Sequence, residues 1–284
     1  MADKNTVFQQ KLSLNIRGRL MDLSAPKIMG ILNLTPDSFY DGGRNNNLTD
    51  AIKKAGELLS EGAHILDIGA YSSRPSAGHI SEDEEHTRLI PVVKAIVEEF
   101  PDAVLSIDTF RSGIARAAIN EGAHIVNDIS GGEMDKEMFQ AVASLHVPYI
   151  LMHMKGTPQT MASMAEYDDL MTEVCHYFSV KIDQLKHLGI VDIIVDPGFG
   201  FAKKTEHSFE LLKNLDQLKI TGHPVLAGLS RKSMIYKTLG TDAESALNGT
   251  VAANTIALMK GANILRVHDV KAAREAIEIF EKVS

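Results

Sequence analysis

Cysteine is almost absent from the sequence. Cys175 is the single example among 284 residues, so the chain cannot form an internal disulfide. The composition, with 44% hydrophobic and 23% charged residues, is close to that of ordinary globular proteins. Low cysteine usage is typical of a reducing compartment, and we therefore expect a cytoplasmic protein.

Long hydrophobic runs are also missing. The apolar stretches are short, roughly four to eight residues, whereas a membrane-spanning helix needs about 20. The N-terminal stretch Met1 to Gln10 is polar and has no apolar core of the length that a signal peptide requires. We therefore expect no association with a membrane.

Positive charge is not in excess. The formal net charge is −8, whereas a general nucleic-acid-binding protein is normally basic. This balance argues against a nucleic-acid partner and favours small-molecule substrates. An anionic substrate stays compatible with it, because a local site can be positive on an acidic protein.

The sequence does contain a repeated alternation of short apolar runs and amphipathic stretches. Helix-like stretches include Leu48 to Ser60, Arg111 to Asn120, Met171 to His187, Ser245 to Lys260 and Ala272 to Val283. The chain contains eight such strand-and-helix units in about 250 residues. This number predicts a single-domain α/β fold, the (β/α)8 TIM barrel. An open, doubly wound sheet is the alternative. The apolar runs, which suit parallel strands buried on both faces, are Lys27 to Asn33, His64 to Gly69, Val104 to Asp108, His124 to Asp128, Pro148 to His153, Asp192 to Asp196, Pro224 to Gly228 and Asn263 to Val267.

Two further patterns concern the barrel's N-terminal end. Gly-Ala-His/Asn-Ile recurs after Glu61, Glu121 and Lys260, and its glycine suits a left-handed helix C-cap before the next strand. The segment Lys11 to Leu23 alternates apolar and polar residues around Arg17-Gly18-Arg19, which predicts a β-hairpin. We expect this hairpin to plug the barrel, and we assign residues 1–24 to an N-terminal extension and 25–284 to the barrel.

Polar side chains stand at the ends of all eight predicted strands. In a barrel these ends converge on one face, where catalytic residues lie, so together they predict a site rather than eight separate caps. The residues are Asn33, Asp67, Asp108, Asn127, Asp128, His153, Asp196, Ser230, Arg231, Lys232, Arg266 and His268, with Ser72, Ser73 and Arg74 following the second strand.

The residue types indicate a phosphorylated or pyrophosphorylated substrate. Lys232 follows the seventh strand and Arg266 and His268 the eighth, where this fold often binds phosphate; Arg74 adds a further cationic donor. The acids Asp67, Asp108 and Asp196 could hold the NH groups of a heterocycle or neutralise the arginines. Asn33 could be a cation ligand beside a pyrophosphate or a plain cap.

The loops after the first two strands are long and rich in Gly, Asn, Ser or Pro. They run from Thr35 to Asn47 and from Tyr71 to His79. Phe39 and Arg74 give each loop a binding group, and we expect both loops to act as lids.

These motifs together make the sequence similar to the dihydropteroate synthases, a family of pterin-binding barrels. Ser73 and Ser76 stand where the family often has threonine and glycine; serine keeps the hydroxyl, and no charged residue is lost. The matching segments run in order along the chain and are Asn33-Leu-Thr-Pro-Asp-Ser-Phe39, Asp67-Ile-Gly69 with Ser73-Arg74-Pro75, Ser106-Ile-Asp108, Asn127-Asp128, Met152-His153, Asp196-Pro-Gly-Phe-Gly200, Gly228-Leu-Ser-Arg-Lys232 and Arg266-Val-His268.

The resemblance implies a role for each matched residue. Asp108, Lys232, Arg266 and His268 would be catalytic. The pterin would be held by Asp108, Asn127, Ile129, Met152, Asp196, Phe201, Gly228 and Lys232. Pyrophosphate would be bound by Asn33, Ser73, Arg74, Arg266 and His268, with Mg²⁺ at Asn33. Pro75, Phe201, Ser230 and Lys232 would frame p-aminobenzoate, its carboxylate lying at a helix N-terminus near Ser230.

The resemblance also implies the reaction. A dihydropterin methyl pyrophosphate would lose pyrophosphate through a cation-like transition state, and the amine of p-aminobenzoate would take its place, giving dihydropteroate. A homodimer is usual in the family. The alternatives are a methyltetrahydrofolate-dependent methyltransferase, disfavoured by the pyrophosphate-binding residues, and an inactive pterin-binding paralogue, disfavoured by the complete residue set.

Overall fold

The protein forms a closed barrel of parallel strands. The computed structural model describes residues 10–34, 44–71 and 80–284. Strands occur in the sheet in the order β8-β7-β6-β5-β4-β3-β10-β9, and every pairing between them is parallel. A bridge between Val195 and Val225, with the Val195 N–H donating to the Pro224 carbonyl at 2.9 Å, joins the two outermost strands. The predicted barrel is confirmed, and the open sheet is excluded.

The strands follow the predicted apolar runs closely. Each lies within its predicted run, and β9 is the shortest because only its central pair keeps ladder geometry. Their bounds are β3 Lys27–Asn33, β4 Ile65–Gly69, β5 Val104–Asp108, β6 Ile125–Asp128, β7 Tyr149–Met152, β8 Ile193–Asp196, β9 Leu226–Ala227 and β10 Ile264–Val267.

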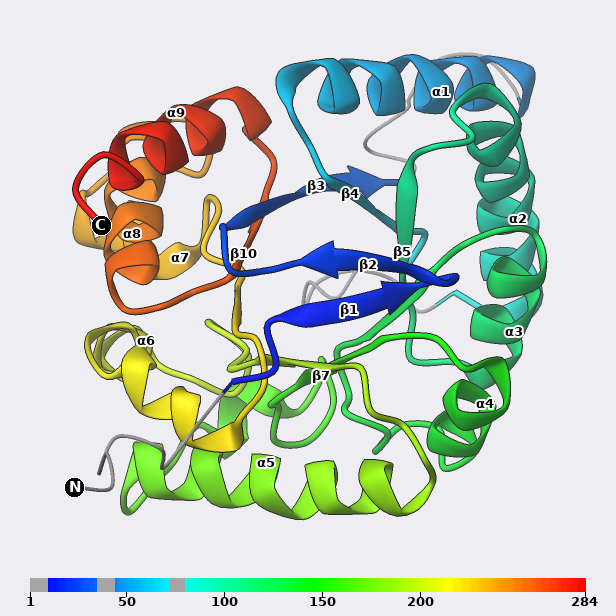
Figure 1. Ribbon diagram of the computed structural model, residues 1–284. Helices are drawn as coiled ribbons and strands as arrows, with labels where there is room; N and C mark the ends of the chain where they lie inside the picture. The colour runs from blue at the N-terminus through cyan, green and yellow to red at the C-terminus, as the bar shows by residue number, and fades with distance from the viewer. Residues whose placement is uncertain (1–9, 35–43, 72–79) are drawn as a thin grey trace, which may run out of the picture.

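Helices form an outer ring around the strands, as Figure 1 shows. The three glycines of the recurring motif have positive φ, at 112°, 117° and 90° for Gly62, Gly122 and Gly261, which confirms their left-handed caps. The helices are α1 Arg44–Glu61, α2 Glu82–Glu99, α3 Ser112–Asn120, α4 Met138–Leu145, α5 Leu170–His187, α6 Thr205–Lys213, α7 Ser233–Thr238, α8 Leu247–Met259 and α9 Val270–Phe280, with 3-10 turns at Met161–Met164 and Leu215–Thr221. In the described residues no helix is long and apolar enough to cross a membrane.

Strand residues alternate between two apolar regions. Leu66 and Ile68 of β4 belong to the large cluster between strands and helices. Ile65, on the opposite face, belongs to a smaller cluster at the N-terminal end of the barrel interior. Because side chains in a strand alternate between faces, Asp67 shares the inward face with Ile65, and polar groups follow this apolar floor toward the other end.

The N-terminal hairpin covers this floor. Strands β1 Ser13–Ile16 and β2 Arg19–Asp22 pair antiparallel, and Figure 1 shows the hairpin lying across the end of the barrel. Leu14, Ile16 and Leu23 are at most 6% exposed and pack with the inward floor residues. The predicted plug is confirmed. Arg17 and Gly18 form its turn, both at positive φ.

Candidate active site

One arginine joins two acids inside the barrel, above the apolar floor. Arg266 of β10 donates from Nε to Asp67 Oδ2 and from Nη2 to Asp108 Oδ2, both at 2.6 Å. Asn127 Nδ2 donates to the same Asp67 oxygen at 3.0 Å. The structure therefore brings the predicted residues of β4, β5, β6 and β10 together, and Asp67 neutralises an arginine rather than standing free.

This group carries more negative than positive charge. Burial raises the pKa of Asp108 to about 7, since Arg266 does not fully offset burial and the nearby Asp67. Burial disfavours the charged form of Arg266, but Asp67 and Asp108 outweigh that effect, and the pKa of Arg266 lies above its usual value. Because one guanidinium faces two carboxylates, the group can still accept a hydrogen bond from a further donor or stabilise a developing positive charge.

A second polar group lies at the ends of β8 and β9. Asp196 Oδ1 accepts a hydrogen bond from the Gly198 N–H at 2.8 Å. Burial raises the pKa of Asp196, and Lys232 opposes the rise. Burial also lowers the pKa of Lys232 to about 8. Gly228 lies against Asp196, since a Cβ there would be 4.0 Å from Asp196 Oδ2.

Apolar residues lie beside these polar groups. Ile129 and Met152 are 6% and 3% exposed and share one small cluster with Phe201 at its edge. The Phe201 ring centroid is 4.5 Å from Lys232 Nζ, and that ammonium also donates to the Phe199 carbonyl. The three residues predicted to line the pterin faces are thus brought together, with a cation over the aromatic one.

Ser230 and His268 form a pair at the other side of the mouth. Their side chains are 3.0 Å apart, between Oγ and Nδ1, and the His268 N–H lies 3.2 Å from Ser230 Oγ. Helix α7 begins at Ser233, with Lys232 at its N-cap. The helix N-terminus predicted near Ser230 is therefore three residues further along, and the Ser230 hydroxyl contacts His268.

Asp128 and His153 do not belong to the ring of mouth residues, which corrects the prediction from strand ends. Asp128 is fully buried and accepts from Tyr149 OH at 2.7 Å and from the Ser130 N–H at 2.7 Å. His153 packs edge-on against Tyr177 of α5, with ring centroids 4.8 Å apart. Both follow an inward residue, Asn127 or Met152, so strand alternation turns them outward.

Arg231 was predicted as a site residue, but its contacts in the structure are structural. It donates from Nε and Nη2 to both carboxylate oxygens of Asp269 at 2.9 and 2.8 Å, and its Nη1 donates to two loop carbonyls. Its φ of 54° is left-handed, which is uncommon for a residue other than glycine. This bidentate pair fixes the Ser230–Lys232 turn to Asp269, the residue that follows His268.

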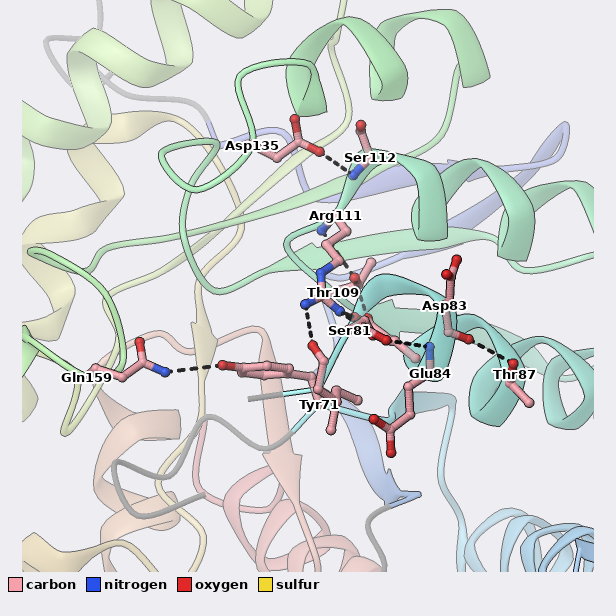
Figure 2. A network of polar contacts seen from close by, with 12 residues as sticks. Tyr71, Ser81, Asp83, Glu84, Thr87, Thr109, Arg111, Ser112, Asp135 and Gln159 are labelled. Carbon is pink, nitrogen blue, oxygen red and sulfur yellow. Dashed lines mark hydrogen bonds and ion pairs between the residues drawn. The ribbon is translucent and has the colours of Figure 1, made fainter. Parts of the chain in front are cut away.

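A buried network centred on Arg111 was missed by sequence reasoning. Its guanidinium pairs with Glu85 and donates to the carbonyls of Ile80 and Ser81 at 2.6 and 3.2 Å. It also lies 5.7 Å from the Tyr71 ring centroid. Figure 2 shows Tyr71 and Ser81 converging on this arginine. Arg111 therefore fixes the chain on both sides of residues 72–79, and the only sequence signal was its place just after Asp108-Thr109.

Several predicted residues cannot be placed. Ser73, Arg74 and Pro75 lie outside the described residues, as do residues 35–43 and 72–79 of the loops predicted as lids at Thr35–Asn47 and Tyr71–His79. The first of these loops is shorter than predicted, because α1 already begins at Arg44. Asn33 ends β3, is half-buried and pairs in register with Gly69. Within 10–34, 44–71 and 80–284, no group of three or more His, Cys, Asp or Glu side chains is arranged to hold a metal ion.

The arrangement can be compared with known proteins. The family model of the pterin binding enzymes matches residues 29–268. A dihydropteroate synthase of Escherichia coli K12 is 43% identical over 272 residues, covering 95% of this chain and 96% of that protein. The chain belongs to the dihydropteroate synthase family. One of Synechocystis is 45% identical over 257 residues, covering 89% of both chains.

Solved dihydropteroate synthases share the whole fold. The enzyme of Yersinia pestis in a sulfonamide drug complex superposes with a TM-score of 0.90 at 43% identity, covering 95% of this chain and 98% of that one. The enzyme of Xanthomonas albilineans with 4-aminobenzoic acid superposes with a TM-score of 0.89 at 40% identity, covering 96% of this chain and 98% of that one. The chain is accordingly an enzyme of the transferase class, and this result favours the synthase over the two alternatives.

Proposed function

We propose that this protein condenses a dihydropterin methyl pyrophosphate with p-aminobenzoate, releasing pyrophosphate and 7,8-dihydropteroate for folate synthesis. The observation that carries the proposal is Arg266 held between Asp67 and Asp108 at 2.6 Å, in a barrel that also brings together the apolar cluster of Ile129 and Met152, with Lys232 over the Phe201 ring at its edge. A flat heterocycle with several NH groups matches that combination of apolar walls and buried acids.

In this proposal the pterin ring lies in the mouth of the barrel. Its NH groups donate to Asp108 and Asp196, which are half-buried or buried acceptors, while Asn127 and Lys232 contact its other polar atoms. Ile129, Met152 and Phe201 line the faces of the ring, and Gly228 leaves the space beside Asp196. Burial of the acids strengthens these hydrogen bonds, because the local dielectric constant is low.

Pyrophosphate lies toward the ends of β3 and β10, with Asn33, Ser73, Arg74, Arg266 and His268 as its partners. Asn33 offers one neutral oxygen, so a magnesium ion fits here only if the pyrophosphate and water supply its remaining ligands, as Mg²⁺ commonly requires. When bound, that ion neutralises charge on the leaving group. Arg266 contributes positive charge from inside the barrel, and His268 lies near it at the end of β10.

The excess negative charge of the Asp67–Arg266–Asp108 group favours a cation-like, SN1-like displacement. Positive charge that develops on the pterin as pyrophosphate departs is stabilised by Asp108. Phe201, Pro75, Ser230 and Lys232 frame p-aminobenzoate, whose amine then attacks the electron-poor methylene carbon. The catalytic set is Asp108, Lys232, Arg266 and His268.

We also propose that the protein is a cytoplasmic homodimer, with residues 1–24 as an extension of the 25–284 barrel. Helices α8 and α9, which pack against each other, are the proposed interface, because they expose Ile256, Met259 and Ile279 to 45%, 71% and 69%. Sedimentation analysis should show a dimer that Met259→Glu converts to a monomer. A wild-type monomer at all concentrations would disprove this part.

The test of the reaction is pyrophosphate release from purified protein with the dihydropterin pyrophosphate, Mg²⁺ and p-aminobenzoate. Release should require p-aminobenzoate, yield dihydropteroate and collapse in Arg266→Ala. Arg274→Ala, which removes a half-exposed arginine of α9, is the matched control and should keep full activity. Tight pterin binding without release would instead indicate an inactive pterin-binding protein.

A further inference from the structure

A lysine outside the predicted site is buried beside it. Lys203, in the connection between β8 and α6, is 8% exposed. Its Nζ contacts His153 Nδ1 at 2.8 Å, the Phe201 carbonyl at 3.1 Å and the His153 carbonyl at 3.4 Å. All three partners are neutral acceptors, and among residues 10–34, 44–71 and 80–284 no carboxylate contacts this ammonium directly. Burying a charge without a direct counter-ion costs free energy, which makes Lys203 a candidate for a functional role.

The charges around Lys203 come from several elements. Burial lowers the pKa of Lys203 to about 7, while Asp196 of β8 favours its charged form and Lys232 and Lys155 disfavour it. Burial also holds the pKa of His153 well below its usual value, so its ring is neutral and Nδ1 is free to accept from the ammonium. The carboxylate that balances Lys203 is therefore Asp196, acting at a distance.

The hydrogen bonds of Lys203 fasten one loop to the end of the neighbouring strand β7. Gly198, at φ 67°, lies so close that a Cβ there would be 2.2 Å from the His153 carbonyl oxygen. Between the Phe201 carbonyl and Lys203, Ala202 has a left-handed φ of 48°. Its carbonyl is held by Tyr167 OH at 2.9 Å. A strained residue persists when its neighbours are fixed, and Lys203 fixes one of them.

We propose that Lys203 is a positioning residue for the reaction. Its ammonium links the β8–α6 loop to His153, and this link keeps the Phe201 ring in place at the mouth of the barrel. Its positive charge also stabilises the ionised form of Asp196. The inference rests on the proposed function, in which Phe201 frames p-aminobenzoate and Asp196 accepts from the pterin. Lys203 itself touches neither substrate.

Two substitutions separate the loop contact from the charge. Lys203→Met removes both, whereas Lys203→Gln keeps a donor for the Phe201 carbonyl without the charge. Lys204→Met is the matched control, because Lys204 is the adjacent residue and is exposed. The measurements are KM for p-aminobenzoate and kcat from pyrophosphate release, and the pH dependence of pterin pyrophosphate binding in a fluorescence titration without p-aminobenzoate.

We expect Lys203→Met to raise KM for p-aminobenzoate about tenfold while kcat changes less than about threefold, since a misplaced binding group acts mainly on the substrate that it contacts. Removing the positive charge should also move the acidic midpoint of pterin binding upward by up to about one pH unit, because Asp196 then keeps its proton longer. Lys203→Gln should recover most of the KM and keep the shifted midpoint.

The inference is overturned if Lys203→Met matches Lys204→Met in both the KM and the midpoint. If Lys203→Met does not fold, Lys203→Gln decides, and an unshifted midpoint in that variant overturns the electrostatic role. Absence of turnover in the wild type would count against the proposed function alone. The pterin titration needs no turnover and still decides whether Lys203 supports Asp196.

Discussion

The two ends of the barrel interior use the same strands for opposite chemistry. At the N-terminal end, Ile65 packs with Leu14 and Leu23 of the hairpin in a dry, apolar floor. Two residues further along the same strand and on the same face, Asp67 binds Arg266 and Asn127. Burial stabilises the fold at the first end, whereas at the second it raises the pKa of Asp108 and lowers that of Lys232. The contrast predicts that stability and activity can be changed separately.

The largest effect should come from Asp67→Asn at the polar end. The amide retains the shape of the side chain but not the charge that orients Arg266, so we expect kcat/KM for pyrophosphate release to fall about 100- to 1000-fold, the range seen when one stabilising group of a transition state is lost. Asp102→Asn, at a side chain 95% exposed, is the control. Retention of more than a tenth of the activity would contradict the role given to this acid.

The apolar end should respond in stability instead. Ile65→Ala removes a fully buried side chain and should lower the free energy of unfolding by about 2 to 5 kcal/mol, measured by urea denaturation. Activity per folded molecule should stay at the wild-type level. Val191→Ala, 56% exposed, should change stability by less than about 0.5 kcal/mol. A large loss of kcat in folded Ile65→Ala would remove the distinction between the two ends.

A smaller loss of stability should come from changes in the helix-to-strand turns at the N-terminal end of the barrel. Gly122 has φ 117° and a Cβ there would be 2.9 Å from Val97, whereas Gly189 has φ 82° and open space around it. Gly122→Ala should therefore cost about 1 to 3 kcal/mol, and Gly189→Ala only the strain of its backbone, about 1 kcal/mol. Thermal unfolding of both variants tests the difference; equal losses would show that φ alone decides.

The smallest expected effect is the change of ligand affinity with pH, which depends on the buried charges at the polar end. Asp108 gains a proton as pH falls through about 7, on the acid side where the raised pKa of Asp196 also acts, and Lys232 loses one as pH rises through about 8. Affinity for the pterin pyrophosphate should therefore be highest between these values and decline on both sides, by up to about tenfold per pH unit. A calorimetric titration across pH 5 to about 10 measures it. An affinity that does not depend on pH would exclude both groups from binding.

The proton on Asp108 has a second consequence, for stability. The folded state holds this proton at pH values where the unfolded chain has already released it. The contribution of Asp108 to the free energy of unfolding is therefore greatest at acid pH. It falls as pH rises from the ordinary pKa of an aspartate toward about 7. Asp108→Asn should flatten that part of the stability profile, which denaturation at several pH values can measure.

Strand positions and inward residues could be predicted because they depend on local sequence. Apolar runs located all eight barrel strands, and the polar residues at the strand ends placed Asp108, Asn127 and Arg266 at one end of the barrel. The prediction failed where it treated every strand-end residue alike, since Asp128 and His153 face outward. Arg231 was predicted with the site residues although it pairs with Asp269, and Lys203 was not found. Their partners lie 38 and 50 residues away along the chain, and no local pattern indicates such pairings.

The hairpin plug has a consequence for synthesis on the ribosome. Its backbone joins Gly222 through the Lys11 N–H, and Asn263 Nδ2 donates to the Leu23 carbonyl at 3.1 Å. The floor that it covers includes Leu226 and Ile264, which are translated long after the hairpin. The hairpin must therefore wait for these later residues before its apolar face is fully covered, and until then the nascent protein exposes a surface that a chaperone can bind.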